Sequence, residues 1–161
     1  MRRATRRIAL TTAGLVAGSA LLSIPGMGQN LRFLAGDWLT ECVTAIPASN
    51  CSLTGVFNGV DNWGTAGSFA VVVGVETLLV AVVGQPSPVR ATLRIDKYPP
   101  VQCTGPRYCV FNEVDALKLV QELSRGAVIL IDVFTRNGTF QLSLSTKGYR
   151  EGLAKIEAAS Q

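Results

Sequence analysis

The chain has 161 residues, with 15 basic and 11 acidic side chains and a formal net charge of +4. Hydrophobic residues make up 48% of it, a content that excludes an intrinsically disordered protein. The sequence contains no histidine, which excludes a Ser-His-Asp triad, a Cys-His pair and any imidazole ligand to a metal.

The first 28 residues have the order of a secretory signal. Four arginines and no acid lie in the first seven residues, an apolar stretch runs from residue 8 to residue 24, and the small residues Gly26 and Gly28 follow. This order predicts a signal peptide over residues 1–28, exported by the Sec or the twin-arginine route. The alternative is an uncleaved membrane anchor, for which the apolar stretch is short and diluted by Thr and Gly.

Removal of this signal changes the charge of the protein. The signal holds four basic residues and no acidic ones, so residues 29–161 carry eleven of each and no net charge. The basic footprint of a nucleic-acid-binding protein is therefore missing, and we predict no nucleic-acid partner. The remaining length suits one domain with a hydrophobic core.

Five β-strands are predicted in the first part of this domain. Short runs rich in valine, leucine and threonine favour a pleated strand over a helix. They cover residues 37–43, 51–57, 69–75, 77–83 and 91–96. We expect the Gly- and Asn-rich segment 58–68, which contains Trp63, to form a loop.

Two helices and a hairpin are predicted after residue 111. Apolar residues recur at helical spacing from Val114 to Leu123, which predicts a helix over about residues 112–125; Asn112 lies at its start and Gly126 at its end. A second helix is expected over residues 149–159.

Between these helices, the dipeptide at residues 137–138, Asn-Gly, predicts a hairpin of strands 127–134 and 139–145. A two-residue turn pairs residue i with residue 275 − i and places Ile131 and Phe140 on an apolar face, with Asp132 on the other. The fold class is therefore mainly β: a sandwich or partly closed barrel of about seven strands with two helices.

Four cysteines in an exported chain predict two disulfides, for which three pairings exist. The sequence spacing favours the two local pairs, Cys42 with Cys51 and Cys103 with Cys109, because each closes a short loop that contains turn-forming residues. Gaps of eight and five residues do not match the spacing of a zinc tetrathiolate site, so we predict no metal.

No pattern in the chain predicts a catalytic or cofactor-binding site. The cysteines are expected in disulfides, and the glycines match no phosphate-binding motif. We therefore predict a protein that is not an enzyme and has no cofactor. A pair of carboxylates brought together by folding, as in a glycoside hydrolase, remains an alternative.

Exposed apolar residues are the candidates for a binding function. Trp63 lies in a polar loop, where an indole can anchor an interface. The run from residue 69 to residue 83 is apolar on both faces and needs cover from the core or from a partner. The candidate interaction surface consists of Trp63, Phe69, Val71, Val73 and Leu79. Trp38, close to a cysteine, is expected to be buried beside a disulfide.

The order of several motifs resembles the invasion-associated locus B family of exported bacterial proteins. The motifs are Gly36-Asp37-Trp38, the cysteine pairs, Leu93-Arg94-Ile95-Asp96 and Ser145-Thr146-Lys147-Gly148-Tyr149. The resemblance covers residues 36–158, and Tyr108 stands where the family usually has glycine. It implies a periplasmic or surface-associated β-sandwich with two disulfides and no catalytic residues.

Two classes of function follow from these features. The first is a periplasmic or secreted, envelope-associated domain that binds another protein, with a membrane surface or a membrane complex as a possible place of action. The second is a small accessory subunit of a periplasmic or inner-membrane enzyme, which a twin-arginine signal favours.

The predicted signal can be tested by N-terminal sequencing of the exported protein. We expect the mature chain to begin near Gln29, because signal peptidase cleaves after small residues. A mature protein that begins at Met1 would instead support the membrane anchor.

Overall fold

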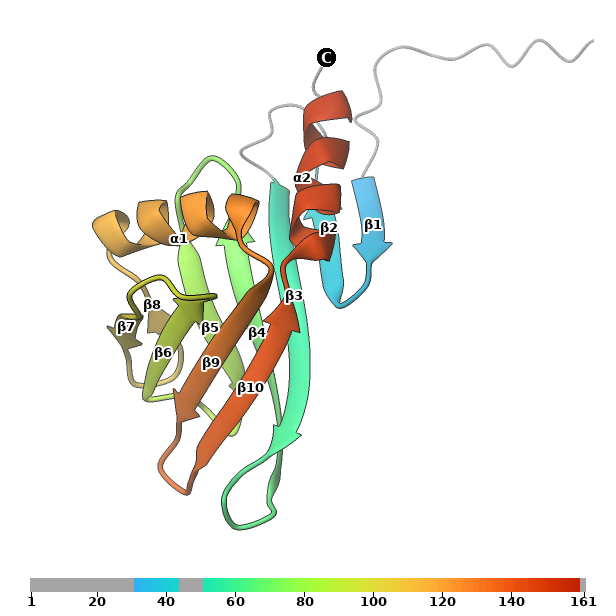
Figure 1. Cartoon of the computed structure of the whole chain (residues 1–161). Coiled ribbons are helices and arrows are strands. Elements are labelled where there is room, and N and C mark those ends of the chain that lie inside the picture. The colour runs from blue at the N-terminus through green and yellow to red at the C-terminus, as the bar shows by residue number, and fades with distance from the viewer. Residues whose placement is uncertain (1–30, 44–50, 160–161) are drawn as a thin grey trace, which may run out of the picture.

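The computed structural model of the chain describes residues 31–43 and 51–159, so the predicted signal peptide lies outside the described residues (Figure 1). The described residues form ten strands and two helices. The strands are β1 (Leu31–Ala35), β2 (Trp38–Cys42), β3 (Cys51–Val60), β4 (Ala66–Gly74), β5 (Val80–Gln85), β6 (Arg90–Ile95), β7 (Val101–Thr104), β8 (Cys109–Val110), β9 (Val128–Phe134) and β10 (Thr139–Ser145). The helices are α1 (Glu113–Arg125) and α2 (Lys147–Ala159).

All ten strands belong to one antiparallel sheet, in the order β1-β2-β3-β4-β5-β8-β7-β6-β9-β10. The mainly β fold with two helices is therefore confirmed. Each of the seven predicted strands has a counterpart. The three further strands are short: β1 lies in the segment before the first predicted strand, and β7 and β8 flank the turn closed by the second disulfide.

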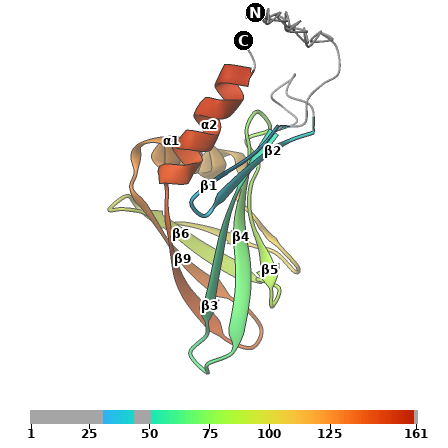
Figure 2. The same cartoon turned by 90° about the vertical axis from the view of Figure 1, so that its right-hand side faces the viewer.

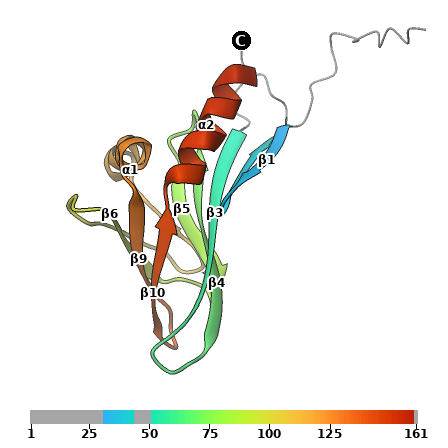
Figure 3. The ribbon, with the colours of Figure 1, turned by 45° about the vertical axis from the view of Figure 1, so that its right-hand side comes forward.

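The sheet curls until its last strand lies beside β3, as Figure 3 shows. A β-bridge between Asp61 and Phe140 joins the two strands at one end of this seam. Of the two predicted architectures, the structure is thus the partly closed barrel. Apolar side chains from the inward face of each strand fill the interior, and α1 adds Ala116, Leu119 and Leu123 to the same core.

Both helices lie at the same end of the barrel, opposite the β3–β4 turn (Figures 1 and 2). The Asn112 side chain caps α1 by accepting a hydrogen bond from the backbone N–H of Asp115 at 3.0 Å, as the sequence predicted. The α2 helix begins two residues before its predicted start and packs against β1, β2 and β3. In the described part of the chain, neither helix is long and apolar enough to cross a membrane.

The predicted register of the β9–β10 hairpin is wrong by two residues. Thr139 pairs with Phe134, so the turn has four residues instead of two. The reason is Thr135, whose hydroxyl accepts hydrogen bonds from the backbone N–H groups of Asn137 and Gly138 and holds a wider turn. A shift of two keeps every side chain on its predicted face, and Phe140 remains in the core.

Two predicted boundaries between strand and loop also differ. Residues 61–65 alone form the loop expected over residues 58–68, because the Asp61 carboxylate accepts the N–H groups of Trp63 and Thr65 and closes the turn locally. The strand expected from residue 77 begins at Val80. Residues 75–79 form a turn in which the Gly74 N–H donates to the Leu79 carbonyl.

Glycines of β3 and β4 make room for large side chains of β10. Gly59 and Gly67 are direct partners in the ladder, yet they face different neighbours. A Cβ atom at Gly67 would lie 2.6 Å from the ring of Phe140 and 2.8 Å from that of Phe69, and both rings are buried. A Cβ atom at Gly59 would meet only the flexible end of Leu142.

This pair gives a matched test of the packing. We expect Gly67→Ala to lower the free energy of unfolding by about 1–3 kcal/mol, because the buried rings cannot move away. Gly59→Ala should cost clearly less, since Leu142 can change rotamer. Urea unfolding of both variants measures the difference, and equal losses would contradict the proposed packing of β10 on β4.

Candidate functional site

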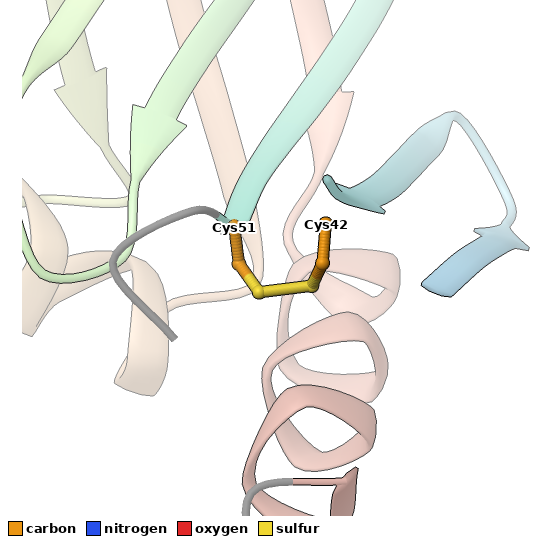
Figure 4. Close-up of a disulfide and its surroundings, with 2 residues drawn as sticks. All are labelled: Cys42 and Cys51. Carbon is orange, nitrogen blue, oxygen red and sulfur yellow. A yellow bond between two sulfur atoms is a disulfide. The ribbon is translucent and has the colours of Figure 1, made fainter. Parts of the chain in front are cut away.

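The four cysteines form the two predicted disulfides. Cys42 joins Cys51 with a Cα–Cα distance of 4.0 Å and links the end of β2 to the start of β3 (Figure 4). Cys103 joins Cys109 with a Cα–Cα distance of 5.4 Å and closes the β7–β8 turn. No free cysteine remains in the described residues, and no group of three or more His, Cys, Asp or Glu side chains there is placed to hold a metal.

Several carboxylates have structural partners. Asp61 closes the β3–β4 turn, and Asp96 accepts the backbone N–H groups of Ala127 and Val128 at 2.9 and 3.0 Å. These carboxylates therefore stabilise the backbone of connections between elements. The hydrolase alternative, which needs two carboxylates facing one substrate, gains no support from them.

Two buried side chains have pKa values above their ordinary values. Burial raises the pKa of Glu122 above its ordinary value of 4.5, and the nearby Lys118 ammonium opposes that rise; the two charged groups are 3.9 Å apart. Burial also raises the pKa of the Tyr149 hydroxyl to about 12, against the effect of a hydrogen bond with Ser124. Both residues lie in the packing of the two helices.

The predicted interaction surface does not form as one patch. Phe69, Val71 and Val73 point inward from β4 and are at most 1% exposed, so they belong to the core and are covered by the protein itself. Trp63 and Leu79 are exposed, but they lie in the turns at opposite ends of β4. Trp38 is buried as expected, and the ring packed against it at 5.2 Å is that of Tyr149.

Four connections gather at the end of the barrel away from the helices. We call this surface the loop end; it consists of residues 61–65, 85–90, 104–109 and 134–139. Figure 1 shows two of its turns, β3–β4 and β9–β10, at the lower end of the barrel. Trp63 is 77% exposed there and Tyr108 is 57% exposed, so two large aromatic side chains face solvent on this surface.

Backbone hydrogen bonds tie these connections together. The Gly105 N–H donates to the Val89 carbonyl at 3.1 Å, and the Val89 N–H donates to the Phe134 carbonyl at 2.9 Å. On the other side, the Thr139 N–H donates to the side chain of Asn62 at 3.3 Å. The Cys103–Cys109 disulfide fixes the remaining turn. The loop end is therefore a connected platform rather than four independent loops.

A cleft of about 330 Å³ lies between three of these connections. Its lining residues are Pro86, Ser87, Val89, Pro106, Arg107, Arg136 and Asn137. Arg107 and Arg136 are both exposed, and neither forms an ion pair with another described residue. The cleft thus combines rigid proline walls with two guanidinium groups that are free to bind.

The charge of the loop end is positive. It contains Arg90, Arg107 and Arg136 but a single carboxylate, Asp61, which is 7% exposed and engaged in its own turn. The Arg90 guanidinium lies over the ring of Phe134 at 4.0 Å, which fixes the arginine beside the cleft. A domain with balanced total charge therefore presents a basic surface at one end.

A larger groove, of about 500 Å³, lies on the outer face of β6, β9 and β10. Arg94 and Asp132 bring charges of both signs to it, and Gln141 and Ser143 add neutral polar groups. This groove carries no concentration of aromatic side chains or of one charge. The loop end is for that reason the stronger candidate for a functional site.

Comparison with protein families, with curated proteins and with solved structures gave no significant match to this chain. The resemblance to the invasion-associated locus B family therefore remains a prediction. Two of the motifs on which this resemblance rests lie together in the structure. Trp38, from the first motif, packs against Tyr149, from the last.

Sequence reasoning found Trp63 but missed Arg107, Tyr108 and Arg136. The one available signal was the short turn between Cys103 and Cys109, whose residues Pro106, Arg107 and Tyr108 are exposed in the structure. Nothing in the sequence indicated that this turn meets the β9–β10 turn.

The raised pKa of Glu122 predicts a pH-dependent stability. The folded state holds the proton of the Glu122 carboxyl more tightly than the unfolded state does. This difference stabilises the fold below about pH 4.5, and the stabilisation is lost as the pH rises through the folded-state pKa. We expect Glu122→Gln to be more stable than the wild type at pH ~7 and equally stable at pH ~3.5. Thermal melts at both pH values measure this.

A companion variant tests the cause. Lys118→Met removes the opposing charge and should enlarge the loss of stability between the two pH values. If Glu122→Gln is instead less stable at neutral pH, its carboxylate is a net stabilising partner of Lys118 and our assignment is wrong.

Proposed function

We propose that this protein is an exported, non-enzymatic domain that binds another protein through the loop end. The observation that carries the proposal is the exposed indole of Trp63, held in a fixed turn on a basic, aromatic surface. Tryptophan, tyrosine and arginine are the residues enriched at the energetic centres of protein interfaces. All three types lie at the loop end.

The cost of binding is low for such a surface. A mobile loop loses conformational freedom when it binds, which subtracts from its affinity. The Asp61 carboxylate holds the backbone on both sides of Trp63, with hydrogen bonds of 2.9 and 2.7 Å to the N–H groups of Trp63 and Thr65. The backbone that carries the indole is therefore ordered before a partner binds.

An exported location supports the proposal. Disulfides persist in the periplasm and outside the cell, whereas the cytoplasm keeps thiols reduced. Both disulfides close loops within the barrel, and the predicted signal over residues 1–28 precedes them. We place the protein in the periplasm or in association with the cell envelope, as the resemblance to the invasion-associated locus B family also implies.

A second candidate is an accessory subunit of a larger envelope complex, which uses more than one surface. The observation that favours it lies at the other end of the barrel. Val114 and Leu117 lie one helical turn apart on α1 and are 78% and 44% exposed. Leu79 is also exposed at this end; it lies just before β5, and β5 pairs with β8, the strand that leads into α1. A subunit held between two neighbours needs apolar contacts at both ends.

Substitution of Trp63 tests the loop end. We expect Trp63→Ala to weaken partner binding by at least about thirtyfold, the loss typical of a central interface tryptophan. Capture of the partner by the native disulfide-bonded protein, followed by mass spectrometry and affinity measurement, provides the readout. Leu79→Ala is the control, because it removes an exposed apolar side chain from the opposite end of β4.

The pattern of losses separates the two candidates. A loss for Trp63→Ala with retention for Leu79→Ala supports the loop end as the binding surface. Losses for both variants support the accessory subunit. Full retention by Trp63→Ala, or a wild-type protein that captures nothing, overturns the proposal.

A further inference from the structure

We propose that the cleft between Arg107 and Arg136 binds an acidic segment of the partner protein, in which Asp or Glu carboxylates pair with the two guanidinium groups. This inference rests on the proposed function and specifies the chemistry of its partner. Three features of the cleft carry it: the type of its charged groups, the way they are fixed, and their lack of partners within the protein.

The positively charged groups at the loop end are all arginines. The described residues contain four lysines, and none of them lies in the loop end. A guanidinium is planar and presents paired N–H donors that match the two oxygens of a carboxylate, whereas a lysine offers a single point of charge. The composition of this end therefore favours recognition of carboxylates over general attraction of anions.

The two arginines come from turns that the fold holds in place. Arg107 lies in the turn closed by the Cys103–Cys109 disulfide, and the Gly105 N–H anchors that turn to the Val89 carbonyl. Arg136 lies in the β9–β10 turn, where the Thr135 hydroxyl fixes the backbone. The backbone of both turns is therefore ordered before binding, and only the arginine side chains lose conformational freedom when the ligand arrives.

The charge of the cleft is not neutralised by the protein. Neither Arg107 nor Arg136 forms an ion pair with a described residue, and Asp61 of the same surface is directed into its own turn. Two positive charges that line one cleft both attract an anion that enters it. An acidic segment would give each guanidinium a carboxylate partner.

A protein ligand fits these observations better than a lipid surface. Sequence-readable binding to anionic membranes relies on clusters of about four to eight lysines or arginines. The loop end has three arginines, and two of them line a cleft instead of a protruding face. A concave site with proline walls suits an extended peptide, whose side chains can enter it.

Binding of hexaglutamate to the full disulfide-bonded protein tests the proposal, with hexaglutamine as the uncharged control. We expect hexaglutamate to shift the NMR signals of residues 85–90, 104–109 and 134–139, and hexaglutamine to leave them unchanged. Arg107→Gln and Arg136→Gln should each weaken hexaglutamate binding about tenfold, the size of one lost charge-assisted pair. Arg125→Gln, an exposed arginine at the end of α1, is the matched control and should bind like the wild type.

A further variant tests whether the turn must be fixed. The double substitution Cys103→Ser and Cys109→Ser opens the turn that carries Arg107, and we expect weaker hexaglutamate binding with an unchanged far-ultraviolet spectrum. If this variant unfolds, the two arginine variants, whose side chains are exposed, still decide the question.

Three results overturn the proposal. The first is equal binding of hexaglutamate by Arg107→Gln, Arg136→Gln and Arg125→Gln. The second is a set of NMR shifts confined to the outer groove around Arg94. The third is no binding of hexaglutamate by the wild type; binding to phosphatidylglycerol vesicles that depends on both cleft arginines then assigns the cleft to lipid. If any of these occurs while Trp63→Ala still loses the partner, the proposed function stands without the acidic ligand.

Discussion

The indole of Trp38 joins β2 to two elements at the other end of the chain, β10 and α2. Its N–H donates a hydrogen bond to the Ser145 carbonyl of β10 at 2.7 Å, and its ring forms a T-shaped contact with Tyr149 in α2. Gly55, its partner on β3, leaves the space for the ring, since a Cβ atom there would lie 2.9 Å from the indole. This contact holds the β1–β2 hairpin and α2 on the barrel.

The same contact determines how the barrel closes. It fixes β10 near β2 at the helix end of the seam, and the Asp61–Phe140 bridge fixes β10 near β3 at the other end. With both ends held, the β3–β4 turn lies beside the β9–β10 turn, and the side chain of Asn62 can bond to the backbone of Thr139. The position of the Trp63 turn beside the β9–β10 turn is therefore a consequence of closure, because β3 and β10 meet only when the sheet curls.

Local chemistry made much of the fold predictable. The valine-rich runs, the helical period after Val114 and the short cysteine loops each depend on neighbours in the sequence, and the structure contains the elements that they predicted. The errors arose where a side chain altered a turn: the Thr135 hydroxyl widened the β9–β10 turn, and the Asp61 carboxylate shortened the β3–β4 loop. Periodicity indicates which face a side chain occupies but not how the turn is hydrogen-bonded.

The sequence by itself determined the strand faces, the first helix, the cysteine pairing and the polar turn that exposes Trp63. Only the tertiary structure decided that Phe69, Val71 and Val73 are core and that Arg107 and Arg136 share one cleft. A strand that is apolar on one face must be covered, but the sequence does not say by what; here the curled sheet covers it with its own strands. The two arginines meet because β7 and β9 both flank β6 in the sheet, a neighbourhood that long-range pairing creates and that no local pattern encodes.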